Sequence, residues 1–316
     1  MVCGGVVAPV AAAAVTTTAT VPRFQASSIA FLDREHGVLA REDWSCTKPR
    51  GCPALILASS DGGASWRISY RTTMPVRLYA IRGTTKVWAS TGKNVVESRD
   101  RGLSWHRVRS DPAAAMAFAD PGHGWLLPVG SLFDHPKPLL ATSSGGRNWK
   151  RIASPCRNEW ALTVALSRPT PSNGWVACTS EASTGFQGKE VWSTSDGGKT
   201  WHPRARTKFP GLPAAGIRDY GNLPAFGYVT GIDFLADGHR WLWEGRGWLL
   251  TTSDEGRSWR RSPITKADVV AAQSASLLTD RLGYVLLRGC TVKLVRTSDG
   301  GATWTTVERW QSPTRC

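Results

Sequence analysis

The chain has 316 residues, of which 41% are hydrophobic and 20% charged, so it can bury a large core. Its 16 tryptophans, 32 glycines and 19 prolines argue against a helical bundle, and no long stretch carries a sustained 3.6-residue apolar period. The formal net charge of +15 supports attraction to anionic partners such as nucleic acid, acidic glycans or phosphate-rich envelopes, although a soluble surface rich in arginine is the more ordinary explanation. There is no dense run of Lys and Arg, which argues against nucleic acid as the partner.

Residues 1–22 are predicted to be an export signal or a disordered N-terminal segment. Val2–Val15 is apolar and uncharged, and it is too short for a membrane span. It suits the apolar part of an export signal, with small residues around Ala11–Ala14 for cleavage, although the positively charged start is missing. We expect an extracytoplasmic protein of bacterial export type, secreted or in the cell envelope, with no membrane span in the mature form.

From Phe24 onward, two short patterns alternate along the chain. The first is an apolar strand, an acidic turn, and a glycine followed by a second apolar strand, which predicts a β-hairpin. It occurs in Ile29–Ala40, Met116–Pro128, Ile232–Glu244 and Leu277–Leu287, with a longer variant in Val164–Cys178 and a looser one in Val76–Ser90.

The second pattern is Ser/Thr-x-Asp-x-Gly-x-Ser/Thr-Trp, called the box below. Five full copies lie at Ser59–Trp66, Ser98–Trp105, Thr194–Trp201, Thr252–Trp259 and Thr297–Trp304, and an eroded copy lies at Thr142–Trp149. Each box predicts a hairpin turn in which the Asp accepts backbone N–H groups, the glycine supplies a positive φ and the Trp covers the turn. The predicted structural residues are Asp61, Trp66, Asp100, Trp105, Ser144, Trp149, Asp196, Trp201, Asp254, Trp259, Asp299 and Trp304.

The spacing of the boxes predicts the architecture. Successive Asp positions are separated by between 39 residues, from Asp61 to Asp100, and 58 residues, from Asp196 to Asp254, which fits one propeller blade per repeat. We predict an all-β fold, a six-bladed β-propeller of four-stranded antiparallel blades with strands A to D, in which the box turn joins strands C and D. Residues 23–316 would form one domain, with blades at about 24–70, 71–109, 110–153, 154–205, 206–263 and 264–316.

These boxes resemble the BNR or Asp-box repeat of bacterial and viral sialidases, sortilin-type receptors, xyloglucan-degrading propellers and photosystem II assembly-factor-like proteins. The resemblance covers roughly Phe24 to Trp310. A box in every blade, preceded by a Gly-Trp type strand, is most similar to the photosystem II assembly-factor-like group. The resemblance implies boxes that are structural and lie away from the ligand face, and a protein that acts as a binding scaffold. The copy at Thr142–Trp149 is the one clear departure from the repeat, with Ser144 in the Asp position and Asn148 in the hydroxyl position.

In a propeller the A–B and C–D turns share one face, and the B–C loops and D-to-A crossovers share the other. Apart from Cys3, six cysteines remain, which allow 15 pairings by sequence alone. The predicted topology places them on the second face as three neighbouring pairs, namely Cys46–Cys52, Cys156–Cys178 and Cys290–Cys316. The alternative is free buried thiols.

The same face carries the longest insertions, at Gly130–Pro138, Ser180–Glu190 and Arg204–Gly227. Because long loops on a rigid scaffold often carry binding residues, we expect the ligand to bind there. For any single residue of these loops, the ordinary alternative is a solvent-exposed side chain without a functional role. The candidate ligand-binding residues are Arg23, Arg71, Asp134, His135, Arg157, Glu159, Trp160, Arg218, Asp219, Tyr220, Glu244 and Arg246.

Known catalytic motifs find little support in this sequence. A sialidase needs three arginines on the substrate carboxylate and a Tyr nucleophile paired with Glu, and neither Tyr220 nor Tyr228 has an identifiable Glu partner. The Phe/Tyr-Arg-Ile-Pro motif that typically opens sialidases is replaced by Val21–Gln25. The six histidines are scattered, and no GxSxG, HExxH, P-loop or GxGxxG motif occurs. We predict no catalytic residue, no metal and no cofactor.

The sequence therefore favours a non-enzymatic binding or assembly scaffold, expected to be monomeric, that binds a protein or an anionic glycan or envelope polymer. The alternative is a glycan-binding or glycoside-hydrolysing propeller of the exo-sialidase type. Fold alone does not decide between these two classes.

Overall fold

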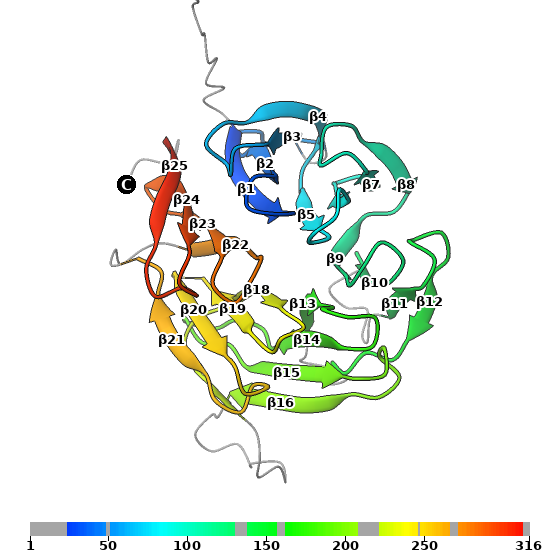
Figure 1. Ribbon diagram of the computed structural model, residues 1–316, viewed down its shortest axis with the longest axis vertical. Helices are drawn as coiled ribbons and strands as arrows, with labels where there is room; N and C mark the ends of the chain where they lie inside the picture. Colours follow the sequence, from blue (N-terminus) through cyan, green and yellow to red (C-terminus); the bar gives the residue numbers. More distant parts are fainter. Residues whose placement is uncertain are drawn as a thin grey trace, which may run out of the picture.

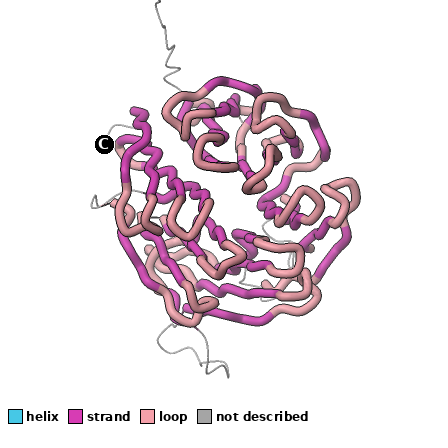
Figure 2. The backbone as a smooth tube through the Cα atoms, in the orientation of Figure 1, coloured by secondary structure: helices cyan, strands magenta, loops and turns pink. Residues whose placement is uncertain are grey.

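The computed structural model describes residues 24–48, 51–129, 138–156, 162–207, 221–245, 247–265 and 271–311. These residues form strands joined by loops, and Figure 2 shows no helix in this part of the chain. The strands group into six sheets arranged around a central axis, as Figure 1 shows. The prediction of a six-bladed β-propeller is confirmed.

Blades 1 to 3 each consist of four antiparallel strands in chain order. Blade 1 contains β1 (Phe24–Phe31), β2 (Gly37–Asp43), β3 (Pro53–Ser59) and β4 (Arg67–Thr73). Blade 2 contains β5 (Arg77–Ala80), β6 (Val87–Ser90), β7 (Val95–Ser98) and β8 (His106–Arg109). Blade 3 contains β9 (Ala113–Phe118), β10 (Gly124–Pro128), β11 (Leu139–Thr142) and β12 (Lys150–Ile152).

Blades 4 to 6 follow the same order, and blade 4 gains a short extra strand. Blade 4 contains β13 (Leu162–Ser167), β14 (Gly174–Thr179), β15 (Lys189–Thr194), β16 (His202–Thr207) and β17 (Gly221–Leu223). Blade 5 contains β18 (Val229–Phe234), β19 (Arg240–Glu244), β20 (Trp248–Thr252) and β21 (Arg260–Pro263). Blade 6 contains β22 (Ala271–Leu277), β23 (Gly283–Arg288), β24 (Thr291–Thr297) and β25 (Thr305–Gln311). Strand β17 pairs parallel to β16, and the sequence did not predict it.

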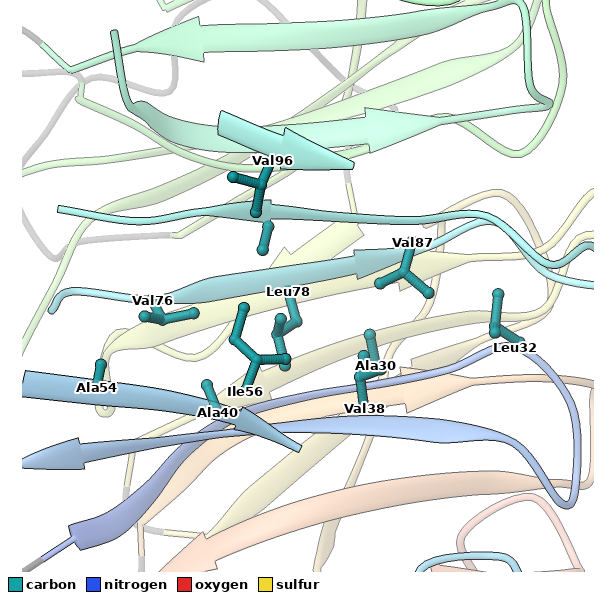
Figure 3. Packing of buried hydrophobic residues seen from close by; sticks show 11 residues of the cluster. Ala30, Leu32, Val38, Ala40, Ala54, Ile56, Val76, Leu78, Val87 and Val96 are labelled. Carbon is teal, nitrogen blue, oxygen red and sulfur yellow. The ribbon is translucent and has the colours of Figure 1, made fainter. Parts of the chain in front are cut away.

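The core lies between neighbouring blades. The cluster in Figure 3 joins Ala30, Val38 and Ile56 of blade 1 to Leu78, Val87 and Val96 of blade 2, all fully or nearly fully buried. Strands that are buried on both faces have near-continuous apolar sequences, as in Val38–Ala40 and Ala54–Ala58. The sheet-on-sheet burial of these small and β-branched side chains is the main force that holds the blades together.

Polar side chains connect the innermost strands of neighbouring blades. These strands belong to separate sheets and are not paired through backbone hydrogen bonds. Ser274 and Ser276 on β22 accept the backbone N–H groups of Ile29 and Phe31 on β1 at 3.1 and 3.0 Å. In the same way, the backbone N–H of Leu78 donates to Ser28 at 3.1 Å, joining blade 2 to blade 1. The ring therefore closes between blades 6 and 1 by side-chain contacts, and among the described residues each four-stranded unit is built from consecutive strands.

Candidate functional site

The two faces of the ring differ as the topology predicts. The A–B turns and the box turns lie together, since the box glycine N–H donates to the A–B turn carbonyl in Gly62–Glu35 and Gly145–Gly122, each at 2.8 Å. We call this the box face. The opposite face carries the B–C loops and the D-to-A crossovers, and we call it the loop face.

On the box face, each intact Asp side chain is saturated with hydrogen bonds. Asp100 accepts the hydroxyl of Ser98 at 2.8 Å, the backbone N–H and hydroxyl of Ser104 at 2.9 and 2.5 Å, and the backbone N–H of Leu103 at 3.1 Å. Although burial alone would raise the pKa of the Asp100 carboxyl, these bonds hold it below its usual range. An acceptor occupied in this way serves the turn and has little capacity left for a ligand.

The box tryptophans pack against the preceding blade. The indole N–H of Trp66 in blade 1 donates to Glu308 of blade 6 at 2.7 Å, and that of Trp201 in blade 4 donates to the Ala153 carbonyl at 2.9 Å. Trp304 of blade 6 lies edge-on to Trp241 of blade 5, with ring centroids 5.7 Å apart. The Trp thus covers the turn, as predicted, and also joins one blade to the next.

A cavity of about 560 Å³ lies on the ring axis. The inner strands of all six blades line it, mostly with small or hydroxyl-bearing residues such as Ala30, Ala115, Ala165, Ser167 and Ser274. Small side chains on the innermost strands leave this space because the blades diverge from the axis. A volume of this size is typical of small-molecule or side-chain pockets.

An ion pair crosses this cavity near the box face. The guanidinium of Arg82, in the A–B turn of blade 2, contacts the Asp233 carboxylate of blade 5 and the Leu277 carbonyl of blade 6. Asp233 also accepts the backbone N–H of Leu277 at 2.8 Å. Since blades 2 and 5 stand opposite each other in the ring, this contact crosses the axis near the box face. We call the loop-face end of the cavity the entrance.

The entrance carries charged groups beside an exposed aromatic ring. The Arg288 guanidinium stacks 3.7 Å from the ring centre of Trp44, which is 42% exposed. Glu42 lies beneath and accepts the backbone N–H of Val76 at 2.6 Å. Burial raises the pKa of the Glu42 carboxyl, and burial lowers the pKa of Arg288 against the opposing effect of Glu42. Trp44 is therefore held in place but still open to a partner.

Exposed large apolar side chains concentrate on the loop face. Within the described ranges six are exposed, and four of them lie in B–C loops or crossovers: Trp44, Val129, Phe186 and Phe226. Phe186 and Phe226 come from two different insertions and meet edge-on at 5.9 Å. The backbone N–H of Gln187 donates to Ala225 and links these insertions at 2.9 Å. The loop face thus presents several exposed apolar groups, of which Trp44 lines the axial cavity.

Most of the residues predicted to bind a ligand lie outside the described residues. These are Arg23, Asp134, His135, Arg157, Glu159, Trp160, Arg218, Asp219, Tyr220 and Arg246. Of the remaining two, Arg71 is exposed on β4, the outermost strand of blade 1, away from the entrance.

Glu244 does not lie on an exposed surface, contrary to the expectation. Its side chain is 0% exposed and lies 3.1 Å from the Lys189 ammonium, which is itself 1% exposed, and 3.5 Å from Arg261. Lys189 also donates to the carbonyls of Pro224 and Ala225. Glu244 therefore anchors the end of the long insertion between blades 4 and 5 and is not available to a ligand.

The cysteine prediction is confirmed for two pairs. Disulfides join Cys46 to Cys52 and Cys156 to Cys178. Cys290 is also disulfide-bonded, and its predicted partner, Cys316, lies outside the described residues. Both assigned bridges lie at the loop face, where they restrain the B–C loop of blade 1 and the crossover into blade 4.

Three of the four described tyrosines have environments that do not suit a sialidase nucleophile. The Tyr284 hydroxyl donates to the Arg34 carbonyl, and the Tyr228 hydroxyl accepts the backbone N–H of Gly185. Burial raises the pKa of Tyr79, which lines the cavity, to about 12, the opposite of what a nucleophile needs. In the same part of the chain, no group of three or more His, Cys, Asp or Glu residues could hold a metal ion. No helix there is long and apolar enough to cross a membrane.

Sequence reasoning missed the exposed aromatic residues of the loop face. Trp44, Phe186 and Phe226 are single aromatics in loops, without a repeat that would mark them. Their common signal is a large apolar residue between the end of one strand and the start of the next, on the side of the blade opposite the box.

Comparison with known proteins shows which solved structures share the fold. No protein-family model matches the chain, and no curated protein matches it. A solved structure of YCF48 bound to D1 peptide is 18% identical, with a TM-score of 0.52 over 91% of this chain and 82% of that one. YCF48 from Cyanidioschyzon merolae is 16% identical with a TM-score of 0.50, over 90% and 85% of the two chains.

A protein of unknown function from Dyadobacter fermentans is 15% identical, with a TM-score of 0.54 over 90% of this chain and 94% of that one. At these identities the likeness shows a shared β-propeller fold. The residues of the loop face must therefore be argued from this chain itself.

Proposed function

We propose that this protein is a non-enzymatic, protein-binding propeller that captures a peptide segment of its partner on the loop face. One observation carries the proposal: four of the six exposed large apolar side chains of the described residues lie on the loop face, where one of them, Trp44, lines the axial cavity. Apolar groups exposed together on a rigid scaffold are typical of protein-interaction surfaces. An apolar or aromatic side chain of the partner would contact Trp44 and Phe186, and the cavity could receive a chain end or side chain.

Two further points support this proposal. One structure with the same fold is described as bound to a peptide, and the box pattern resembles that of the assembly-factor-like propellers. The protein would act outside the cytoplasm, because disulfides such as Cys46–Cys52 and Cys156–Cys178 persist in oxidising compartments. The glycosidase alternative lacks a tyrosine–glutamate pair among the described residues, while Tyr220 lies outside them.

A peptide selection tests the proposal. A phage-displayed random peptide library is selected on the full chain, and the dissociation constants of enriched peptides are measured by fluorescence polarisation. We expect Trp44→Ala and Phe186→Ala to weaken binding by about 30-fold or more, because aromatic anchors in an interface are worth about 2 kcal/mol. Leu103→Ala is the matched control, since Leu103 is 58% exposed but lies in the box turn of blade 2.

The proposal fails if the Leu103→Ala control loses as much affinity as the loop-face variants. It also fails if no peptide is enriched while the wild-type chain hydrolyses a fluorogenic sialoside, a result that would establish the glycosidase alternative. Unchanged circular dichroism spectra would show that the variants are folded.

A further inference from the structure

A second cavity, remote from the loop face, lies between blades 2 and 3 on the box face. This groove has a volume of about 460 Å³. One wall comes from blade 2, with Lys86, Glu97 and Arg99, and the other from the A–B turn and box turn of blade 3, including Ser144 and Arg147. Its blade 3 wall is the only eroded box of the six.

The eroded box lacks the carboxylate that organises the other five turns. In blades 2 and 4, the Asp carboxylate accepts the backbone N–H of Leu103 at 3.1 Å and of Lys199 at 2.9 Å. In blade 3 the Ser144 hydroxyl accepts only the backbone N–H of Asn148, at 3.0 Å, besides its contact with Thr142. The corresponding N–H of Arg147 has no carboxylate acceptor in this turn, so the donor that bonds to the Asp in blades 2 and 4 is exposed here without that partner.

Cationic side chains surround this position. The groove is lined by Lys86, Arg99 and Arg147 and by one acid, Glu97, so three positive charges and one negative charge leave a net charge of +2. Glu97 is buried and already has partners, at 2.6 Å from Lys86 and 3.0 Å from Arg99. Lys86 is only 17% exposed in its side chain, and its ammonium contacts the Pro121 carbonyl across the groove at 3.4 Å.

We propose that this groove binds a phosphate- or sulfate-type oxyanion at the place where the other boxes hold an Asp carboxylate. The oxyanion accepts the Arg147 backbone N–H and lies within the field of Lys86, Arg99 and Arg147. A dianion matches the net charge of the lining, and backbone N–H groups with nearby cations are the usual donors for such groups. The anion can be a free ion or a phosphoryl group carried by a larger molecule. This site is independent of the peptide-binding proposal.

The sharpest test is a substitution that places a carboxylate of the protein where the anion is proposed to bind. In Ser144→Asp, an internal carboxylate takes the place of the ligand, so phosphate affinity should fall at least about tenfold because of like-charge repulsion at short range. The same variant should melt at a higher temperature than the wild type, because it restores the carboxylate that accepts backbone N–H groups in the intact boxes. Loss of binding together with a gain in stability cannot result from misfolding.

Isothermal titration calorimetry at constant ionic strength measures binding, with inorganic phosphate and glycerol 3-phosphate as separate probes. Ser144→Ala should keep its phosphate affinity within about threefold, because the hydroxyl is not the anion's main partner, whereas Arg147→Gln and Lys86→Gln should weaken it. Arg309→Gln is the charge-matched control, since it lowers the net charge by the same amount as Ser144→Asp from an exposed position on β25.

Tighter binding of the ester than of the free ion would identify a carried phosphoryl group, and equal binding would identify a free oxyanion. The proposal is overturned if neither probe binds saturably or if Ser144→Asp binds as well as the wild type. It is also overturned if Arg309→Gln loses as much affinity as Ser144→Asp, because the attraction would then come from the overall charge.

Discussion

A single buried ion pair fixes the end of the longest insertion, Arg204–Gly227, against the propeller. Lys189 on β15 and Glu244 on β19 are both almost completely buried, and each loses hydration. Burial accordingly raises the pKa of Glu244 and lowers that of Lys189, while each partner opposes the shift of the other. Gly227, with φ of +97°, passes close to the Glu244 carboxylate, where a Cβ would lie within 2.9 Å of an oxygen. The pair thus holds the chain against blade 5.

Removing the cation of this pair should be costly. In Lys189→Met the Glu244 carboxylate stays buried with only Arg261 nearby, and we expect a loss of about 3–5 kcal/mol in the free energy of unfolding. Urea denaturation measures this change. The double variant Lys189→Met/Glu244→Gln should recover a large part of it, because no unpaired charge remains. A single variant as stable as the wild type would contradict the structural role assigned to Glu244.

At the scale of the element, the glycine that opens strand B is required by an aromatic ring. Gly37 and Gly124 lie against Phe31 and Phe118 of their own blades, and Gly174 and Gly283 lie against Trp125 and Trp241 of the preceding blades. A Cβ on any of these four would lie closer than 3.0 Å to ring carbons. The glycine that opens strand B therefore makes room for an aromatic ring, within the blade at Gly37 and Gly124 and between blades at Gly174 and Gly283.

Substitution of one such glycine should destabilise the whole blade stack. For Gly174→Ala the new Cβ would lie 1.9 Å from Trp125, so we expect a loss of about 1–3 kcal/mol, the usual cost of overpacking a core. Gly245→Ala is the control, because its nearest neighbours are 3.8 Å away. Differential scanning calorimetry should show a lower melting temperature for the first variant and little change for the second. Equal losses of melting temperature in the two variants would indicate that the loss of glycine's backbone freedom, and not a steric clash with Trp125, destabilises the protein.

Sequence patterns predicted the elements that are stabilised by contacts between residues close together in the chain. The box is closed by contacts within four residues, such as Asp61 with Ser65, so its residue types reveal the turn directly. The site depends on distant pairs, and Arg82 and Asp233 are 151 residues apart. Strand β17 was missed for the same reason, since Gly221 fits there by packing under the Gly256 carbonyl of another blade. No local pattern encodes such proximity.

At the scale of the whole molecule, five intact boxes make the protein sensitive to acid. Hydrogen bonds lower the pKa values of all five box carboxyls, and those of Asp61 and Asp254 fall to about 2. A carboxyl with a lowered folded-state pKa contributes stability above its unfolded pKa of 3.8, and that stability is lost as pH falls. Glu42, Glu244 and Glu308 have raised pKa values and act in the opposite direction, at pH above about 4.5.

We therefore expect the free energy of unfolding to change little or rise slightly from pH 7 to about 5, and to fall steeply from about pH 4 to 2. Urea titrations across this range measure the profile. Asp61→Ala should make the acid limb shallower, because one of the titrating carboxyls is gone. A profile that declines equally between pH 7 and 5 would contradict the assignment to the boxes.

The crossing of the axis by Arg82 and Asp233 also limits how a ligand can travel. A polymer threaded along the axis would have to displace this bridge between opposite blades. While the bridge is intact, a group that enters from the loop face is expected to leave by the same route. If the proposed peptide binding is correct, the partner would therefore insert a chain end or a protruding side chain, and the propeller would not slide along a continuous chain.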